Sequence, residues 1–307
     1  MSIHLRGKKI NEIPGLKGSV KIKPIKGLLR GNKYYVRNSA GKDMILILGD
    51  ASMQYRMKDE IRWIKYFENY DIPTNRFLDF GVYDSGQRYY MMLSWIPGKD
   101  VQQLFRNESP QFCSLLGRKS GELLRRIHAL PLNLEESYHA TLSEEISACI
   151  AEYSGNDILL KKYPAMETFI RFLEDNKFNL ADSGKQKLLH GDYHSGNIIF
   201  SEDNVSVIDW IYGTTGNPIE DFVRNVISAE SNKYYASALI DGYYNNKIPE
   251  EFWRTLAIYT AIHELHITKY DFAAPRWSVS FVNHQHNLVL QEYRGMKTIV
   301  PSYYVKR

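Results

Sequence analysis

The pattern of the chain changes at Ile96-Pro97-Gly98, and this change constrains the fold more than any other feature. Before it, short apolar stretches are separated by turn residues, as in antiparallel strands. After it, apolar residues recur at helical spacing through most of the remaining sequence. We therefore expect an α+β fold with two lobes. A β-rich N-terminal lobe would span residues 1–93 and a mainly helical C-terminal lobe residues 94–307, with the link at residues 94–98.

Local patterns place the elements of each lobe. Turn residues at Asn38 to Gly41 separate two strand candidates, and a helical pattern follows from Ser52 to Tyr70. The expected strands are Asn32 to Arg37, Asp43 to Leu48, Phe77 to Tyr83, Arg88 to Ser94, Asn197 to Phe200 and Val205 to Ile208. The expected later helices span residues 110–130, 141–153, 165–178, 221–229, 233–244, 249–270 and 278–293.

The composition narrows the class of protein. The two cysteines, Cys113 and Cys149, imply no disulfide framework and favour the reducing cytoplasm. No apolar run approaches the ~20 residues that cross a bilayer, so no membrane partner is expected. Residues 1–60 hold 13 lysines and arginines against 5 acidic residues, although the net charge of the chain is only +4. Because no regular aromatic stacking motif accompanies this basic region, we expect no nucleic-acid partner.

The segment from Leu188 to Trp210 carries the strongest functional signal. It contains Asp192, then Asn197 five residues later, and Asp209 at the end of the next apolar stretch. Phosphoryl transfer needs one carboxylate to orient or deprotonate the attacking hydroxyl and oxygen ligands that hold Mg²⁺ on the triphosphate. A hairpin between Asn197 and Asp209 would bring these two side chains to the same end, where they could bind a hard metal ion.

Two histidine patterns offer a competing interpretation as a zinc hydrolase. His190, Asp192 and His194 alternate as metal ligands on a strand would, and His263-Glu264-Leu265-His266 is similar to part of a zinc-protease helix. A zinc site needs three or four fixed ligands, and the helix motif needs its second histidine four residues after the first, where this chain has Ile267. Zinc chemistry is therefore the weaker hypothesis.

Three stretches resemble the aminoglycoside phosphotransferase and choline kinase group, which are small-molecule kinases with a protein-kinase-like fold. The H-x-D-x-x-x-x-N catalytic loop of the group is similar to His190 through Asn197. Its metal-binding I-D-[FW] signature is similar to Ile208-Asp209-Trp210. Its G-D-P-x-x-D-L-A-R stretch is similar to Gly216 through Arg224. The resemblance implies a two-lobed protein-kinase-like fold for this chain.

The resemblance also implies a role for individual residues. Asp192 would be the catalytic base that aligns the substrate hydroxyl, and Asn197 and Asp209 would bind Mg²⁺. His190 would be structural and orient the loop. Asp221 would brace the loop as a buried carboxylate, although an ordinary helix N-cap is an equal alternative for it. His194 lies in the variable part of the motif and receives no role.

Nucleotide-binding positions carry over from the N-terminal lobe. The stretch Gly27 to Val36 is similar to the first hairpin of the group, whose turn covers the phosphates, and it contains Gly27, Gly31 and Asn32. The stretch Tyr89 to Gly98 is similar to the link, where the backbone of Ser94 and Ile96 would bind the nucleotide base.

One position departs from the family pattern. The group has a lysine or arginine in its third strand that grips the phosphates and pairs with a helix glutamate. Glu60 matches the glutamate, but Ile47 stands where the cation is expected. Three explanations are open: the register is different, a nearby cation such as Lys33 or Lys42 substitutes, or nucleotide binding is weak.

The expected function is an NTP-dependent O-phosphotransferase that moves the γ-phosphate of ATP or GTP to a hydroxyl of a small molecule, foremost an aminoglycoside-like antibiotic. Residues 211–275 hold eight acidic side chains against five basic ones, which suits a cationic substrate. The alternatives are a degenerate kinase-like protein that binds nucleotide or a partner without catalysis, a choline or amino-alcohol kinase, and a nucleic-acid-binding module. Whether the protein is a monomer or a dimer is left open.

Overall fold

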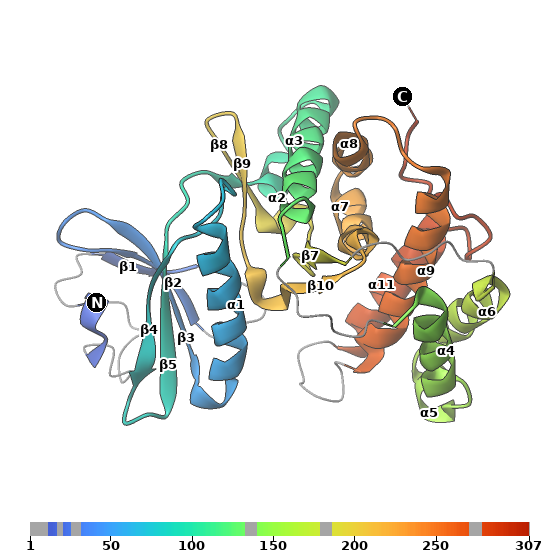
Figure 1. Ribbon diagram of the computed structural model, residues 1–307, viewed down its shortest axis with the longest axis horizontal. Coiled ribbons are helices and arrows are strands. Elements are labelled where there is room, and N and C mark those ends of the chain that lie inside the picture. The colour runs from blue at the N-terminus through green and yellow to red at the C-terminus, as the bar shows by residue number, and fades with distance from the viewer. Residues whose placement is uncertain are drawn as a thin grey trace. The chain divides into compact units, whose positions relative to one another are not determined.

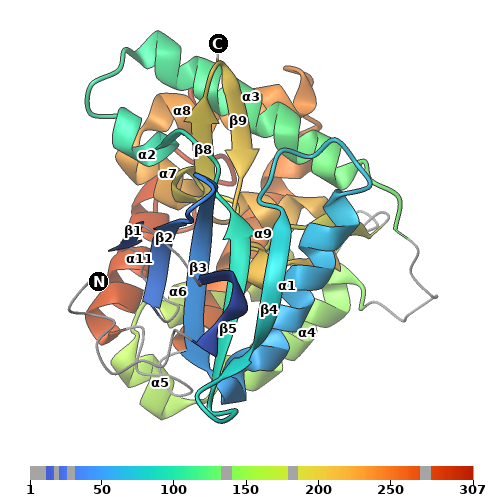
Figure 2. The same cartoon turned by 90° about the vertical axis from the view of Figure 1, so that its left-hand side faces the viewer.

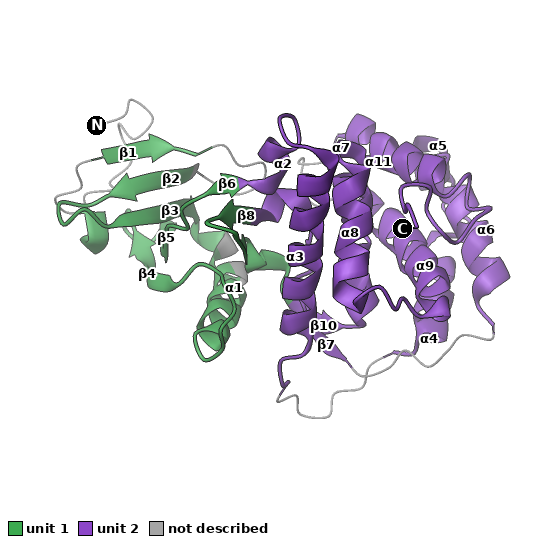
Figure 3. Cartoon of the chain, turned by 90° about the horizontal axis from the view of Figure 1, so that it is seen from above, with its two compact units in different colours: residues 1–99, 199–213 green, residues 100–198, 214–307 purple. Residues whose placement is uncertain are grey.

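The first 99 residues and a short returning segment, residues 199–213, form one structural unit, and the rest of the chain forms a second (Figure 3). The computed structural model describes residues 12–16, 21–25, 32–132, 140–178, 186–269 and 278–306. Unit 1 is residues 1–99 and 199–213, and unit 2 is residues 100–198 and 214–307. The boundary after Ile198 divides the 188–210 segment, so Asp192 and Asn197 belong to unit 2 and Asp209 to unit 1.

Unit 1 is built on a five-stranded antiparallel sheet in the order β1-β2-β3-β5-β4 (Figure 2). Its strands are β1 (Lys21–Pro24), β2 (Asn32–Arg37), β3 (Asp43–Asp50), β4 (Phe77–Tyr83) and β5 (Arg88–Ser94). The expected bounds of β2, β4 and β5 are confirmed, and β3 runs two residues further than expected. The helix α1 (Gln54–Phe67) follows a 3₁₀ turn, η4 (Ala51–Met53), which Asp50 caps by accepting from the Ser52 N–H at 3.0 Å.

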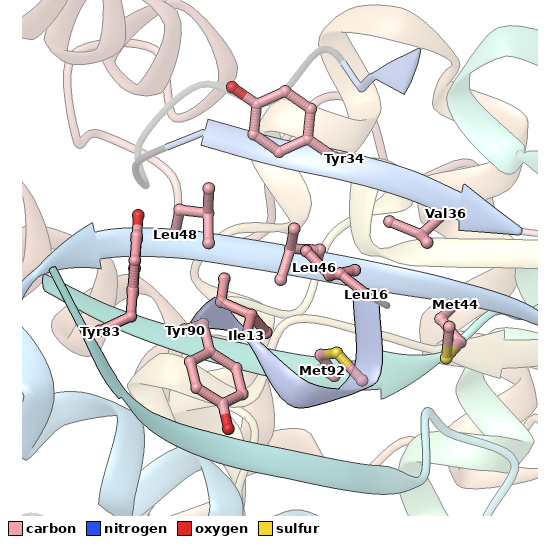
Figure 4. Packing of buried hydrophobic residues seen from close by; sticks show 10 residues of the cluster. All are labelled: Ile13, Leu16, Tyr34, Val36, Met44, Leu46, Leu48, Tyr83, Tyr90 and Met92. Carbon is pink, nitrogen blue, oxygen red and sulfur yellow. The ribbon is translucent and has the colours of Figure 1, made fainter. Parts of the chain in front are cut away.

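The two faces of this sheet have different coverings. One face packs under the short 3₁₀ helix η3 (Pro14–Leu16), where apolar side chains form a buried cluster (Figure 4). Its members are Ile13, Leu16, Tyr34, Val36, Met44, Leu46, Leu48, Tyr83, Tyr90 and Met92. Because successive strand residues point to opposite faces, Lys33, Tyr35, Ile45 and Ile47 belong to the other face, which α1 covers (Figure 1).

The returning segment of unit 1 is fixed by contacts with residues that precede β4. The segment contains most of β8 (Ile198–Ser201), then β9 (Asn204–Val207) and the 3₁₀ helix η6 (Trp210–Tyr212). The Thr74 hydroxyl donates to the Val207 carbonyl at 2.7 Å and accepts from the Trp210 indole N–H at 2.9 Å. The buried Trp210 ring lies 4.2 Å from that of Phe67, between ring centroids. These contacts hold the backbone on both sides of Asp209.

Unit 2 is mainly helical (Figure 1). Its helices are α2 (Val101–Leu104), α3 (Pro110–His128), α4 (Leu142–Tyr153), α5 (Asp157–Lys162), α6 (Met166–Asn176), α7 (Asn225–Ser231), α8 (Lys233–Tyr244), α9 (Glu250–His266) and α11 (Val279–Glu292). The short strands β7 (Lys187–Leu189) and β10 (Thr214–Gly216) pair antiparallel. A two-residue strand, β6 (Lys99–Asp100), is hydrogen-bonded to β8. Within the described part of the chain, no helix has the length and apolarity to span a membrane.

Helix α3 packs closely against α8, and this packing positions His128 at the end of α3. Gly117 and Gly121 lie one turn apart on α3, and a Cβ atom at either position would meet a backbone oxygen of α8 at 2.2 or 2.0 Å. Any larger residue would therefore push the two helices apart. The approach brings His128, at the C-terminus of α3, to 2.9 Å from the Tyr243 hydroxyl of α8.

One expected helix is divided in two. Residues 221–229 were expected to form a single helix, but the structure has a 3₁₀ helix, η7 (Pro218–Phe222), and then α7 (Asn225–Ser231). The Asn217 side chain starts η7 by accepting from the Ile219 N–H at 3.0 Å, and Glu220 bonds back to the Asn217 N–H at 2.7 Å. This early start turns Asp221 toward the loop that follows β7.

Candidate active site

The loop that follows β7 is held by one buried carboxylate. Asp221 accepts from the backbone N–H of His190 at 2.8 Å and of Gly191 at 2.7 Å, and His128 Nε2 lies 3.0 Å from its Oδ2. Gly191 has φ +76°, which glycine adopts without strain. Because Asp221 is only 1% exposed and takes all three contacts, it fixes the loop backbone just before Asp192.

Asp192 lies at the centre of the contacts in this loop. Its Oδ1 accepts from Arg224 Nε at 3.0 Å, and its Oδ2 accepts from Asn197 Nδ2 at 3.2 Å. The imidazole of His194 lies 3.7 Å from the same Oδ2. Burial alone would raise the pKa of Asp192, but the interaction with His194 and the charge of Arg224 outweigh it and hold the pKa well below its usual range. The carboxylate is therefore ionised.

His263 holds the guanidinium that pairs with Asp192. Its Nε2 lies 3.2 Å from Arg224 Nη1. Because a guanidinium can only donate, His263 Nε2 must be the acceptor and the imidazole must be neutral. Burial, and then the nearby charge of Arg224, lower the pKa of His263 to about 3, in agreement with this geometry. Asp192, Arg224 and His263 thus form a connected chain within unit 2.

Asn197 has one side-chain atom with the right chemistry for a metal ion. It ends the 3₁₀ turn η5 (Ser195–Asn197) and is buried. Its Nδ2 donates to the Asp192 backbone carbonyl at 2.9 Å and to the Asp192 carboxylate. Since both of these partners accept, the amide nitrogen faces them, and the amide oxygen points away as the atom that can bind a cation.

Asp209 occupies an unusual backbone conformation in unit 1. Its φ of 74° and ψ of 64° lie in the left-handed region, which aspartate tolerates better than most residues. Its Oδ2 lies 3.1 Å from Lys33 Nζ on β2. A lysine of the five-stranded sheet thus forms an ion pair with the carboxylate that follows β9.

The remaining residues expected to bind nucleotide are all assigned to unit 1, and the structure describes some of them. Glu60 is buried in α1. The Ser94 N–H donates to the Arg76 carbonyl at 2.9 Å, and the Ser94 carbonyl accepts from Asn75 Nδ2 at 2.8 Å. Ile96 is half-buried, and Asn32 begins β2. Gly27 and Gly31 lie outside the described residues.

The structure gathers His190, Asp192, Asn197 and Asp221 into one hydrogen-bonded group in unit 2, whereas Asp209 and Glu60 lie in unit 1. Sequence reasoning assigned no role to four other members of this group, His128, His194, Arg224 and His263. Arg224 was visible in the motif after Asp209. His263 stood out only in the histidine pattern behind the zinc interpretation, and neither it nor His128 could be linked to this loop, because only the folded chain brings them there.

The donor atoms of the two expected metal ligands, Asn197 in unit 2 and Asp209 in unit 1, suit a hard cation better than zinc. Among the residues that the structure describes, no three His, Cys, Asp or Glu side chains are grouped so as to hold a metal ion. An amide oxygen at Asn197 and a carboxylate at Asp209 are the donors that Mg²⁺ uses when phosphate and water supply its other ligands. The two residues therefore fit Mg²⁺ by their chemistry.

Comparison with known proteins gives the family and the fold. The model of the phosphotransferase enzyme family matches residues 21–254. A thermostable mutant of the aminoglycoside phosphotransferase APH(4)-Ia, in ternary complex with ADP and hygromycin B, is 12% identical with a TM-score of 0.69, covering 94% of this chain and 99% of that one. The gentamicin–APH(2")-IIa complex is 14% identical with a TM-score of 0.65, covering 97% and 99%.

An amicoumacin kinase, hAmiN, in complex with AMP-PNP, Ca²⁺ and Ami, is 13% identical with a TM-score of 0.63, covering 98% of both chains. No curated protein matches the sequence significantly. The structural neighbours confirm the expected α+β, two-lobed protein-kinase-like fold. With three quarters of its length matched by one family model, the chain belongs to the phosphotransferase enzyme family and is a phosphotransferase.

Proposed function

We propose that the protein transfers the γ-phosphate of ATP or GTP to a hydroxyl of a small cationic molecule, foremost an aminoglycoside-like antibiotic. The observation that carries this proposal is the ionised Asp192, held by Arg224 and Asn197 in a loop that Asp221 fixes. A carboxylate with a fixed orientation can accept a hydrogen bond from an acceptor hydroxyl and align its oxygen for in-line attack.

Asp192 retains capacity for that hydroxyl. An ionised carboxylate has about four lone-pair sites, and Arg224 and Asn197 occupy two of them. Its lowered pKa makes it a weak base, so its main task is to orient the hydroxyl. It takes the proton once the oxygen has begun to bond to phosphorus. Mg²⁺ bound by Asn197 Oδ1 and Asp209 would supply charge neutralisation for the triphosphate.

The N-terminal lobe, residues 1–93, would bind the nucleotide, and residues 94–307 would supply catalysis and acceptor binding. The Ser94 carbonyl accepts one hydrogen bond and has a second lone pair for the base. Gly27, Gly31 and Asn32 would cover the phosphates, and buried Glu60 would brace the phosphate-binding cation. We place this reaction in the cytoplasm, where nucleoside triphosphates are available. The buried free thiols of Cys113 and Cys149 would stay reduced there.

An acidic pocket in unit 2 supports a cationic acceptor. It has a volume of about 330 Å³, and its described lining includes Glu145, Glu152 and Glu220, of which Glu152 is paired with Lys269. Burial raises the pKa of Glu220 to about 7, and burial also raises that of Glu145. A bound ammonium group would favour the ionised form of both carboxyls. The structural neighbours in complex with hygromycin B and gentamicin support the same class of acceptor.

The test is phosphate transfer measured with ATP and with GTP against hygromycin B, gentamicin, choline and 2-aminoethanol. We expect Mg²⁺-dependent transfer to an aminoglycoside and loss of at least about 100-fold in turnover for Asp192→Asn, the size of a general-base contribution. Transfer to choline alone would assign the protein to the amino-alcohol kinases. Nucleotide binding without transfer to any acceptor would instead support a degenerate member, for which apolar Ile47 is the structural argument.

A further inference from the structure

We propose that Lys33 on β2 supplies the phosphate-gripping cation whose usual place on the third strand is taken by Ile47. This inference rests on the proposed kinase function. Its starting point is the register of the sheet, in which Lys33 and Ile47 are direct cross-strand partners of β2 and β3. Residues that face each other across a strand pair have Cβ atoms about 4.5–5.5 Å apart, so a cation on β2 is displaced from the third-strand position by only one strand spacing.

Lys33 also lies on the correct face of the sheet. The apolar cluster under η3 takes Tyr34 and Val36 from β2 and Leu46 and Leu48 from β3. Lys33 and Ile47 therefore project to the opposite face, toward α1. Glu60, the residue expected to brace the cation, belongs to α1 and is buried. Lys33 is therefore on the same face of the sheet as position 47, where the family has its cation.

The ammonium group of Lys33 already lies against the proposed metal-binding carboxylate. Its Nζ is 3.1 Å from Asp209 Oδ2, and about a fifth of each side chain is exposed. The contact is within unit 1, where the Thr74, Val207 and Trp210 contacts fix the segment around Asp209. In kinases the cation and the metal neutralise neighbouring oxygens of the same triphosphate, so a cation beside the metal-binding carboxylate has the position that this task requires.

Two other basic residues near this position, Arg37 on β2 and Lys42 before β3, do not meet this condition. Arg37 is engaged by Asp43, with Nε and Nη2 at 2.6 and 2.7 Å from the two carboxylate oxygens. Lys42 is exposed just before β3 begins. It lies five residues from Ile47, which is roughly 16 Å along an extended strand. Of these three residues, Lys33 is the one that both pairs with Ile47 across the sheet and contacts the Asp209 carboxylate.

The test compares binding of AMP-PNP with binding of adenosine, which lacks phosphates, to the parent, Lys33→Met and the control Lys42→Met. Isothermal titration calorimetry with Mg²⁺ present gives each dissociation constant. We expect Lys33→Met to weaken AMP-PNP binding by roughly ten- to a hundredfold, as for loss of one charge-assisted contact, and to leave adenosine binding unchanged. Lys42→Met should bind both as the parent does, and Lys33→Arg should retain most of the AMP-PNP affinity.

The outcomes separate this inference from the function on which it rests. If the parent binds AMP-PNP and Lys33→Met binds it equally well, Lys33 is not the cation and the kinase proposal stands. An equal loss for adenosine would make the role of Lys33 structural and would also overturn the inference. If the parent binds neither AMP-PNP nor its guanine counterpart GMP-PNP, the proposed function fails; if it binds GMP-PNP alone, the variants are compared with GMP-PNP and guanosine. Melting temperatures without nucleotide establish folding, and Lys33→Gln, which keeps chain length and polarity, replaces Lys33→Met if that variant is unfolded.

Discussion

Nε of Arg224 lies 3.0 Å from Oδ1 of Asp192, so the proposed catalytic carboxylate is in an ion pair before any substrate arrives. Side chains of both residues are largely buried, at 14% and 16% exposure. A buried ion pair contributes little net stability, but it fixes geometry, and removal of one partner leaves an uncompensated charge. We therefore interpret Arg224 as a positioning residue, with His263 as its support from α9.

Arg224→Met should lower kcat by roughly ten- to a hundredfold, because a carboxylate displaced by about 1 Å aligns the hydroxyl poorly. The KM for nucleotide should stay unchanged. The pKa of Asp192 would rise toward the usual carboxyl range, so the acid limb of kcat should move to higher pH. Steady-state kinetics from pH 3 to 9, with folding checked at each pH, would measure both effects. Arg171→Met, an exposed position on α6, is the matched control, and an unchanged acid limb in Arg224→Met would contradict the positioning role.

Asp221→Asn should destabilise the fold and the loop together. The amide nitrogen of asparagine would face one of the three donors that Asp221 now accepts from, His190 N, Gly191 N or His128 Nε2. Hydrogen bonds to charged groups contribute about 1.5–3 kcal/mol each, so we expect the free energy of unfolding to fall by about 3 kcal/mol. Urea unfolding measures this. Asp203→Asn, at an exposed turn between β8 and β9, should cost less than about 0.5 kcal/mol.

The parts of the fold that could be predicted from the sequence are those with a local cause. Strands β4 and β5 have the expected bounds because two apolar stretches on either side of turn residues at Asp84 to Gly86 specify a hairpin. The short helices α2 (Val101–Leu104) and α5 (Asp157–Lys162) were not predicted, because four or six residues carry too little periodicity. Both begin at a side-chain cap, at Asp100 and at Asn156 respectively.

The candidate site divides in the same way. The spacing of Asp192, Asn197 and Asp209 was readable because one loop and one hairpin carry all three. The pairing of Asp192 with Arg224, and of Arg224 with His263, was not readable, because the two residues follow Asp192 by 32 and 71 residues and come together only through the packing of α7 and α9 in unit 2. The cross-strand pairing of Lys33 with Ile47, on which the proposal for the phosphate-gripping cation rests, was also not readable, because strand register is not a local property of the sequence.

The buried carboxyl group of Glu264 should make the free energy of unfolding depend on pH. Burial raises its pKa to about 8, and its Oε2 has no hydrogen-bond partner among the described residues. Because the folded state holds this proton more tightly than the unfolded chain, whose glutamates have a pKa of about 4.3, stability should be full below that pH and fall as pH rises toward 8. Glu264→Gln should remove this pH-dependent loss of stability, which reaches a few kcal/mol by pH 8.

Urea unfolding at pH 4, 6 and 8 would check this prediction. The parent and Glu264→Gln should be equally stable at pH 4, and the variant should be the more stable of the two at pH 8. Glu174→Gln, an exposed position on α6, should follow the parent at every pH. Equal slopes for the parent and Glu264→Gln between pH 4 and 8 would show that Glu264 is ionised in the folded protein and would contradict the assignment.

Moving the cation from β2 to β3 gives the sharpest prediction for the sheet. In the double variant Lys33→Met/Ile47→Lys, a lysine stands at the third-strand position on the same face, directly across the ladder from its original place. We expect AMP-PNP affinity to recover to within about tenfold of the parent, since the charge returns to the same end of the site. The melting temperature should fall, because Ile47 is 2% exposed and a lysine there loses hydration. A folded double variant that binds AMP-PNP no better than Lys33→Met would show that the strand position of the cation, and not only its face, determines phosphate binding.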